Sequence, residues 1–231
     1  MYRIFGPKFW ITAISYVVLA TNFAFGLLDE YLPEIGVEPS FGKVVFWVQV
    51  VIAIFFVTPI WRLFWKAFPK MNDWVFPDLN GEWEVEICSN WPRIERLLKS
   101  ACGKEPSIDF RVCDGEELPS LTPLKMRARI TQTWGHIHIH LWNPNQDTPI
   151  KDSDTFLVEP IRGGENARPA MSYMFSQRNE TDVVSDAPMF HGAARLEIQP
   201  GYNVMEGTMW SNRMWRRGMN TAASLRFVRA I

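Results

Sequence analysis

The 231-residue sequence has few cysteines and almost no net charge. Three cysteines, an odd number, do not make the paired framework of a small secreted domain. A formal charge of -1, from 24 basic and 25 acidic side chains, gives no global field that would attract nucleic acid. The sequence also lacks a glycine-rich phosphate loop, a nucleophile elbow, a Cys-x-x-Cys pair and a convincing carboxylate dyad. These absences argue against a secreted disulfide scaffold, a DNA- or RNA-binding protein and an enzyme.

Apolar residues are concentrated at the start of the chain. Residues 1–70 contain 44 side chains of the AVILMFWYC set, whereas the whole chain is 47% apolar with a mean hydropathy of -0.09. Residues 9–28 and 44–61 carry no charge, and a helix of either length can cross a hydrocarbon core of about 30 Å. We therefore predict a transmembrane hairpin over 1–70, with helices at about 9–28 and 44–65. A cleaved signal peptide is the alternative for the first run, although its uncharged core is long for one.

Charges beside the two runs predict the membrane topology. Arg3 and Lys8 precede the first run, and three basic residues follow the second. The connecting loop has four acidic residues against Lys43 alone. The positive-inside rule then places both termini, and everything after Lys70, in the cytoplasm. The cysteines should therefore be reduced thiols. The hairpin is either a plain anchor or an element that self-associates or perturbs the membrane.

Residues 71–231 show the two-residue period of β-strands. Trp83, Val85 and Ile87 alternate with glutamates in the first predicted strand. Similar alternation predicts seven further strands at 126–134, 137–141, 154–159, 171–177, 193–198, 204–213 and 222–229. Eight strands on this scale predict an all-β, mostly antiparallel, lipocalin-like barrel with room inside for one small ligand.

One segment between the first two predicted strands departs from this period. Residues 91–102 have the spacing of a helix after a plausible Ser-Asn cap, and we predict a short helical insertion there. A short extra strand at 108–112 is also expected. The domain organisation is thus a membrane hairpin at 1–70 and a ligand-binding barrel at 71–231.

Strand alternation predicts which polar side chains face the barrel interior. Gln132 and Trp134 share a face with apolar residues of their strand, as do Ser211 and Arg213. Burying a polar group without a partner costs about 2–7 kcal/mol, so these residues need internal partners or a ligand. An inward arginine can hold a phosphate, and an interior tryptophan can stack on a base. A satisfied internal network is the alternative.

His136, His138 and His140 form a His-x-His-x-His pattern. On one strand they point the same way, about 6.8 Å apart, and two such histidines can share a metal ion. The opposite face carries Ile137 and Ile139, which belong to the core. We therefore expect the histidines on the outer surface, with no carboxylate at ligand spacing, and predict no metal site.

Several short motifs occur in an order that is informative as a set. They are Pro77–Trp83 (PDLNGEW), Ile130–Trp134 (ITQTW), Ser153 with Thr155, Tyr173, and Met205–Arg213 (MEGTMWSNR). Behind two membrane helices, this set resembles the two-transmembrane, β-strand-rich effectors of bacterial CBASS anti-phage systems, the CD-NTase-associated or SMODS-associated effectors. The resemblance covers nearly the whole chain. Met209 and Ser211 depart from the expected residues, and residues 89–123 resemble an insertion.

The resemblance implies that the barrel binds a cyclic dinucleotide made by a partner CD-NTase during infection. Binding would drive homo-oligomerisation, and the helices would then disrupt the bacterial inner membrane. No catalytic residue, metal or further cofactor is implied. The expected ligand contacts are Trp83, Gln132, Trp134, Tyr173, Ser211 and Arg213. Two other interpretations stay open: a membrane-anchored lipocalin-like carrier of an apolar ligand, and a structural membrane protein whose barrel is filled with side chains.

Overall fold

The computed structural model describes residues 4–31, 41–145, 150–180 and 186–230. The chain divides into two compact units. The first unit comprises Met1–Val75 together with Thr133–His136, and the second comprises Phe76–Gln132 and Ile137–Ile231. Each unit is described by itself.

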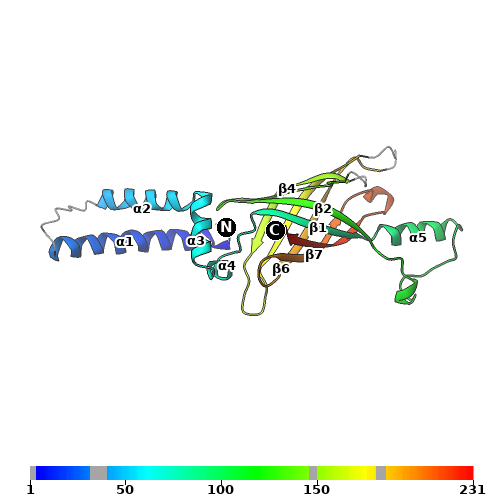
Figure 1. The fold of residues 1–231 in the computed structure, drawn as a ribbon, viewed down its shortest axis with the longest axis horizontal. Coiled ribbons are helices and arrows are strands. Elements are labelled where there is room, and N and C mark those ends of the chain that lie inside the picture. Colours follow the sequence, from blue (N-terminus) through cyan, green and yellow to red (C-terminus); the bar gives the residue numbers. More distant parts are fainter. Residues whose placement is uncertain (1–3, 32–40, 146–149, 181–185, 231) are drawn as a thin grey trace. The chain divides into compact units, whose positions relative to one another are not determined.

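The first unit is helical. It contains α1 (Pro7–Tyr31), α2 (Phe41–Phe55), α3 (Thr58–Ala67) and the short α4 (Met71–Trp74). Helices α1 and α2 lie side by side (Figure 1). By length and composition, Pro7–Leu27 is apolar enough to cross a membrane, whereas α2 and α3 pass the same test only as a pair bent by 80°. The first predicted helix is therefore confirmed as a long apolar helix, and the single continuous helix predicted over 44–65 is wrong.

A proline causes the break between α2 and α3. Pro59 has no backbone N–H, and its ring would clash with the carbonyl of Phe55, four residues earlier. Accordingly α2 ends at Phe55, and Val57 takes an extended conformation with φ of -65° and ψ of 124°. Pro59 then lies in the first turn of α3, where proline is well tolerated. The Thr58-Pro59 dipeptide was therefore a readable signal for this bend.

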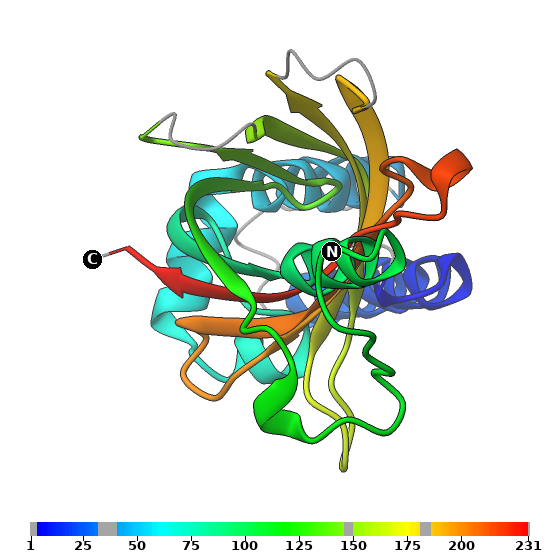
Figure 2. The same cartoon turned by 90° about the vertical axis from the view of Figure 1, so that its right-hand side faces the viewer.

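The second unit is a closed β-barrel whose strands follow sequence order, with every neighbouring pair antiparallel and β1 paired to β8 (Figure 2). The predicted eight-stranded antiparallel barrel is confirmed. Its strands are β1 (Gly81–Ser89), β2 (Thr122–Gln132), β3 (Ile137–Trp142), β4 (Ile150–Ile161), β5 (Ala170–Asn179), β6 (Met189–Ile198), β7 (Val204–Ser211) and β8 (Ala222–Arg229).

The connections differ from the prediction in detail. The predicted helical insertion is confirmed as α5 (Trp91–Ala101), which extends from the end of the barrel where β1 ends (Figure 1). Residues 108–112 form no strand, so the extra strand predicted there is wrong. Short 3-10 turns occur at η3 (Gly115–Glu117) and η4 (Trp215–Arg217). Two predicted strands continued two residues too far, since β2 ends at Gln132 and β7 at Ser211, and β2 also begins earlier, at Thr122.

The barrel core follows the strand alternation. Trp83, Val85 and Ile87 are buried, and the glutamates between them are exposed. The antiparallel pairing determines which strands begin and which finish at each end of the barrel. At the Trp83 end, β1 begins and β2 and β8 finish; at the Arg213 end, β1 and β7 finish and β8 begins. The six predicted ligand contacts are distributed between these two ends, the middle of the barrel and the first unit.

Candidate functional site

Trp83 and Gln132 belong to a closed network at the Trp83 end. The Gln132 side-chain oxygen accepts a hydrogen bond from the Leu79 backbone N–H at 2.8 Å, and its amide nitrogen donates to the Pro77 carbonyl at 3.1 Å. The Trp83 indole N–H donates to the Leu79 carbonyl at 3.0 Å, and the Arg229 guanidinium lies 4.5 Å from the centre of the indole. Neither Trp83 nor Gln132 is exposed. At this end, Trp83 and Gln132 therefore have internal partners, as in the alternative of a satisfied internal network.

Trp134 lies outside the barrel interior, so its predicted inward orientation is wrong. It follows the end of β2 in the turn 133–136, which belongs to the first unit. Its ring lies 5.4–5.9 Å from the rings of Trp10, Phe55, Phe56 and Trp65. Strand alternation assigns a face only while the strand continues. The residue therefore packs in an aromatic cluster of the helical unit.

Tyr173 lies in the middle of the barrel beside a small cavity. The side chain is buried, and burial raises the pKa of its phenol above the ordinary value of 10.0. The cavity, which Ser153, Thr155 and Gln177 also line, measures about 20 Å³. This is room for about one water molecule, whereas drug-sized ligands occupy pockets of about 300–1,000 Å³. A nucleotide therefore does not fit inside the barrel as it stands.

Buried polar side chains gather toward the Arg213 end. Among the described residues eight polar side chains are buried, and Gln132 alone lies at the Trp83 end. The other seven lie in the halves of the strands nearer the Arg213 end, or directly beside those strands. They are Asn143, Ser153, Thr155, Gln177, Asn179, Ser211 and Thr221. We name the group formed by Gln177, Asn179, Ser211, Thr221 and Arg213 the polar mouth.

Hydrogen bonds satisfy most of the polar mouth. The hydroxyls of Ser211 and Thr221 are 2.7 Å apart, and the Gln177 amide nitrogen donates to the Asn179 side-chain oxygen at 3.1 Å. The buried amide nitrogen of Asn179 has no hydrogen-bond partner among the described residues. A buried donor without a partner costs about 1–3 kcal/mol. This orphaned donor suits an incoming acceptor.

Arg213 lies in the turn after β7, not on the strand as predicted. Its Nε and Nη2 atoms donate to the two carboxylate oxygens of Asp186 at 2.9 and 2.5 Å. The side chains of Arg213 and Asp186 are 17% and 8% exposed. The guanidinium also lies 5.7 Å from the ring centres of Trp91 and Phe190. This two-pronged donor geometry matches a phosphate as well as a carboxylate.

A pocket of about 290 Å³ opens beside this ion pair. Asp186 and Phe190 line it together with Trp215, Arg216 and other residues of the turn after β7. Trp215 is 60% exposed, and the Arg216 guanidinium lies 5.5 Å from its ring centre. Within the same turn, Met214 takes a left-handed conformation with φ of 51°, which costs a non-glycine residue about 1–2 kcal/mol. Such strain concentrates at functional sites.

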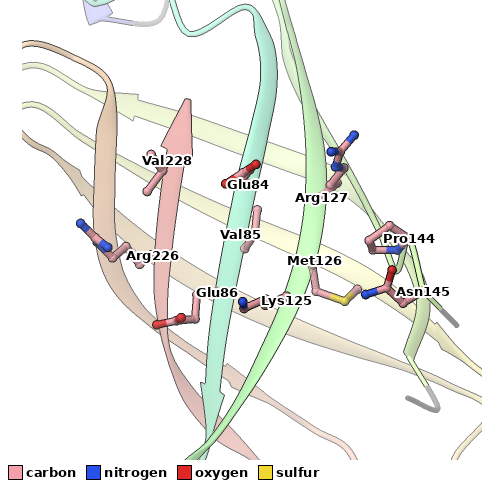
Figure 3. Close-up of a pocket in the computed structure, with 10 residues that line it drawn as sticks. All are labelled: Glu84, Val85, Glu86, Lys125, Met126, Arg127, Pro144, Asn145, Arg226 and Val228. Carbon is pink, nitrogen blue, oxygen red and sulfur yellow. The ribbon is translucent and has the colours of Figure 1, made fainter. Parts of the chain in front are cut away.

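A larger pocket, of about 470 Å³, lies against the outer face of the barrel (Figure 3). Glu84 and Glu86 of β1 line it beside Lys125, Arg127 and Arg226 of the two neighbouring strands. The register sets Glu84 opposite Arg127, and Glu86 between Lys125 and Arg226. Each acidic side chain thus has a basic neighbour within the sheet. The basic side chains of the outer pocket lie beside acidic neighbours on the outside of the sheet, whereas the polar mouth gathers buried polar side chains and an orphaned donor, which makes the polar mouth the better candidate site.

The histidine strand corrects one expectation. The Asp154 carboxylate lies 2.9 Å from the Nδ1 of His140 and 3.4 Å from the Nε2 of His138, so a carboxylate does stand beside the histidines. His138 and His140 are partly exposed on the outer face, as predicted. In the part of the chain that the structure describes, no group of three side chains is arranged to hold a metal ion.

Comparison with known proteins places the chain in a family. No protein-family model matches it. It is 35% identical over 176 residues to CD-NTase-associated protein 15 of Escherichia albertii, and the match covers 74% of this chain and 71% of that protein. The ordered motifs and the eight-stranded barrel agree with this similarity. The chain therefore belongs to the CD-NTase-associated protein 15 family of CBASS effectors.

Proposed function

We propose that this protein is an anti-phage effector whose barrel binds a cyclic dinucleotide at the polar mouth. The observation that supports it most is Arg213, a mostly buried guanidinium held beside aromatic rings where the buried polar side chains gather. The relative's name links that protein to a CD-NTase, and we extend this link to the present chain. A nucleotidyltransferase would then supply the ligand.

The polar mouth matches the two chemistries of such a ligand. Arg213 can donate two parallel hydrogen bonds to a phosphate. Trp215, which is 60% exposed, offers a face on which a base can stack, at about 1–3 kcal/mol per base. The orphaned amide of Asn179 can donate to a base edge or a phosphate.

Asp186 occupies the position that we propose for a phosphate of the ligand. Because it engages the Nε and Nη2 atoms of Arg213, an incoming phosphate that binds this edge of the guanidinium has to displace the carboxylate. The carboxylate therefore stabilises the unliganded state and lowers ligand affinity. Of the residues expected to contact the ligand, Ser211 and Arg213 lie at the polar mouth, and Tyr173 lies deeper beside the small cavity.

The membrane role is proposed from the helical unit. Large apolar side chains of α1 and α2 are exposed, among them Ile11 (67%), Phe23 (68%), Trp47 (62%) and Val51 (63%). Lipid would cover these surfaces. We propose a two-pass protein of the bacterial inner membrane with the barrel in the cytoplasm, where ligand binding drives oligomerisation and the helices then breach the bilayer.

Calorimetry of the full-length chain in detergent micelles tests the proposal against a panel of cyclic di- and trinucleotides. We expect one or more of them to bind, and Arg213→Ala to weaken that binding at least tenfold while the barrel stays folded by circular dichroism. Absence of binding by every member would refute the receptor proposal. It would instead favour a structural role in the membrane, with which the nearly filled barrel interior also agrees.

A further inference from the structure

We propose that α3 is an interfacial helix, which lies in the plane of the membrane and binds an anionic lipid surface. The inference rests on the proposed membrane location of the helical unit, and it differs from the predicted span over 44–65, in which α3 would continue across the bilayer. It concerns residues Thr58–Ala67 alone.

The geometry of the bend supports this placement. The fifteen residues of α2 rise about 22 Å, and a span shorter than a hydrocarbon core of about 30 Å is accommodated by local thinning of the bilayer, so the second pass does not require α3 to cross. At the bend the chain turns by 80°, so α3 runs nearly at right angles to α2 (Figure 1). When α2 stands along the bilayer normal, α3 must lie close to the membrane plane. Pro59 fixes this bend in the sequence, because α2 cannot continue through it.

One face of α3 packs within the protein and another is exposed and apolar. Trp61 and Trp65, four residues apart, are buried at 0% and 2% exposure. Ile60 and Leu63 are 37% and 65% exposed, and Ala67, also exposed, continues the same face at helical spacing. An exposed apolar stripe on an amphipathic helix, with its other side fixed to protein, is typical of a helix that lies in a membrane interface.

The charge of α3 indicates the kind of surface that it meets. Lys66 borders the apolar stripe, Arg62 lies one turn before Lys66 on the same side of the helix, and α3 contains no acidic residue. Basic residues at a membrane surface each gain from anionic headgroups. The other amphipathic helix, α5, differs in this respect, because Glu95 lies within it and pairs with Lys99 at 3.0 Å. A lipid surface with anionic headgroups therefore suits α3.

Site-directed spin labelling of the full-length chain tests the proposal. The three cysteines, all at least partly exposed, are replaced by serine, and single cysteines for labelling are introduced at Ile60, Leu63 and Ala67. The protein is reconstituted in vesicles of phosphatidylcholine with phosphatidylglycerol. Label depth is measured from collisions with oxygen and with a water-soluble nickel chelate. Val17→Cys in α1 and Leu157→Cys on the barrel, 50% and 42% exposed, serve as membrane and aqueous controls.

We expect the three α3 labels to lie at one depth near the headgroups, within about 3 Å of each other, because a helix parallel to the surface has no depth gradient. A span would instead separate positions 60 and 67 by about 10 Å along the normal. That gradient, or labels that collide only with the nickel chelate, would overturn the proposal. If the Val17 label is also aqueous, the proposed membrane location itself fails. Arg62→Gln with Lys66→Gln should move the labels toward water.

Discussion

Replacing Asp186 with asparagine should strengthen ligand binding and weaken the fold. In the wild-type chain the carboxylate holds Arg213 by two charged hydrogen bonds in a site where both side chains are mostly buried. Hydrogen bonds to charged groups contribute about 1.5–3 kcal/mol, and we take this range for the whole pair because both side chains keep some contact with solvent. Breaking the Arg213–Asp186 pair costs this amount, which is subtracted from the free energy of ligand binding when a phosphate replaces the carboxylate.

The expected magnitude follows from that range. Because about 1.4 kcal/mol corresponds to a factor of ten, Asp186→Asn should tighten binding of a cyclic dinucleotide roughly 10- to 100-fold. Removing one partner of a fully buried pair costs about 3–5 kcal/mol. Here partial exposure reduces the loss in the free energy of unfolding to about 1–3 kcal/mol. Opposite signs for affinity and stability distinguish this explanation from simple damage to the fold.

The assay is titration calorimetry with denaturant unfolding of the same samples. A matched control is Asp152→Asn, which removes an equally two-pronged carboxylate from Arg178, at 2.6 Å for each hydrogen bond. Asp152 lies on β4 and its arginine is 59% exposed, so the control should change neither affinity nor stability by much. Unchanged or weaker binding by Asp186→Asn would show that Arg213 does not meet the phosphate.

Three further predictions concern residues with other surroundings. Gln132→Ala should destabilise the barrel by about 2–4 kcal/mol in urea unfolding, because it leaves Leu79 and Pro77 backbone groups without their buried partner. A loss below about 1 kcal/mol would contradict this. Trp134→Ala should leave ligand affinity unchanged in calorimetry yet destabilise the helical unit by about 3–5 kcal/mol. A loss of affinity would show that Trp134 contacts the ligand. Burial raises the pKa of Tyr173, so its contribution to the free energy of unfolding is full below pH 10.0 and is lost as the pH rises beyond it. Tyr173→Phe should therefore remove part of the loss of stability at alkaline pH. An unchanged dependence of unfolding on pH would contradict the raised pKa of Tyr173.

Periodicity predicted the wall of the barrel well and its ends poorly. The alternation of Trp83, Val85 and Ile87 identifies an inward face because one strand geometry holds over all three residues. Trp134 was misplaced because that geometry stops at Gln132, and Arg213 because β7 stops two residues before it. Strand ends depend on turn chemistry and on contacts between segments far apart in sequence, which local alternation does not encode.

The candidate site was recoverable in part. Asn179 shares the face of Tyr173 and Gln177 along β5, so extending the predicted strand by two residues would have found it. No sequence signal indicates that Asp186 pairs with Arg213, because the two residues meet only when β6 and β7 are neighbours in the barrel. The bend at Pro59 was readable, yet the uncharged run on either side of it concealed the change of direction.

The closure of the barrel by β1 and β8 also limits how copies of the protein can assemble. A strand from another chain can be added only where a sheet offers unpaired backbone groups along an edge. Each of the eight described strands already has two neighbours in the ring. Strand addition is therefore confined to the stretches of β2 and β4 that extend past β3, residues 122–126 and 155–161, and any other contact in a filament or ring must be held by side chains, loops or helices. Single substitutions on those surfaces should be able to abolish assembly without opening the sheet.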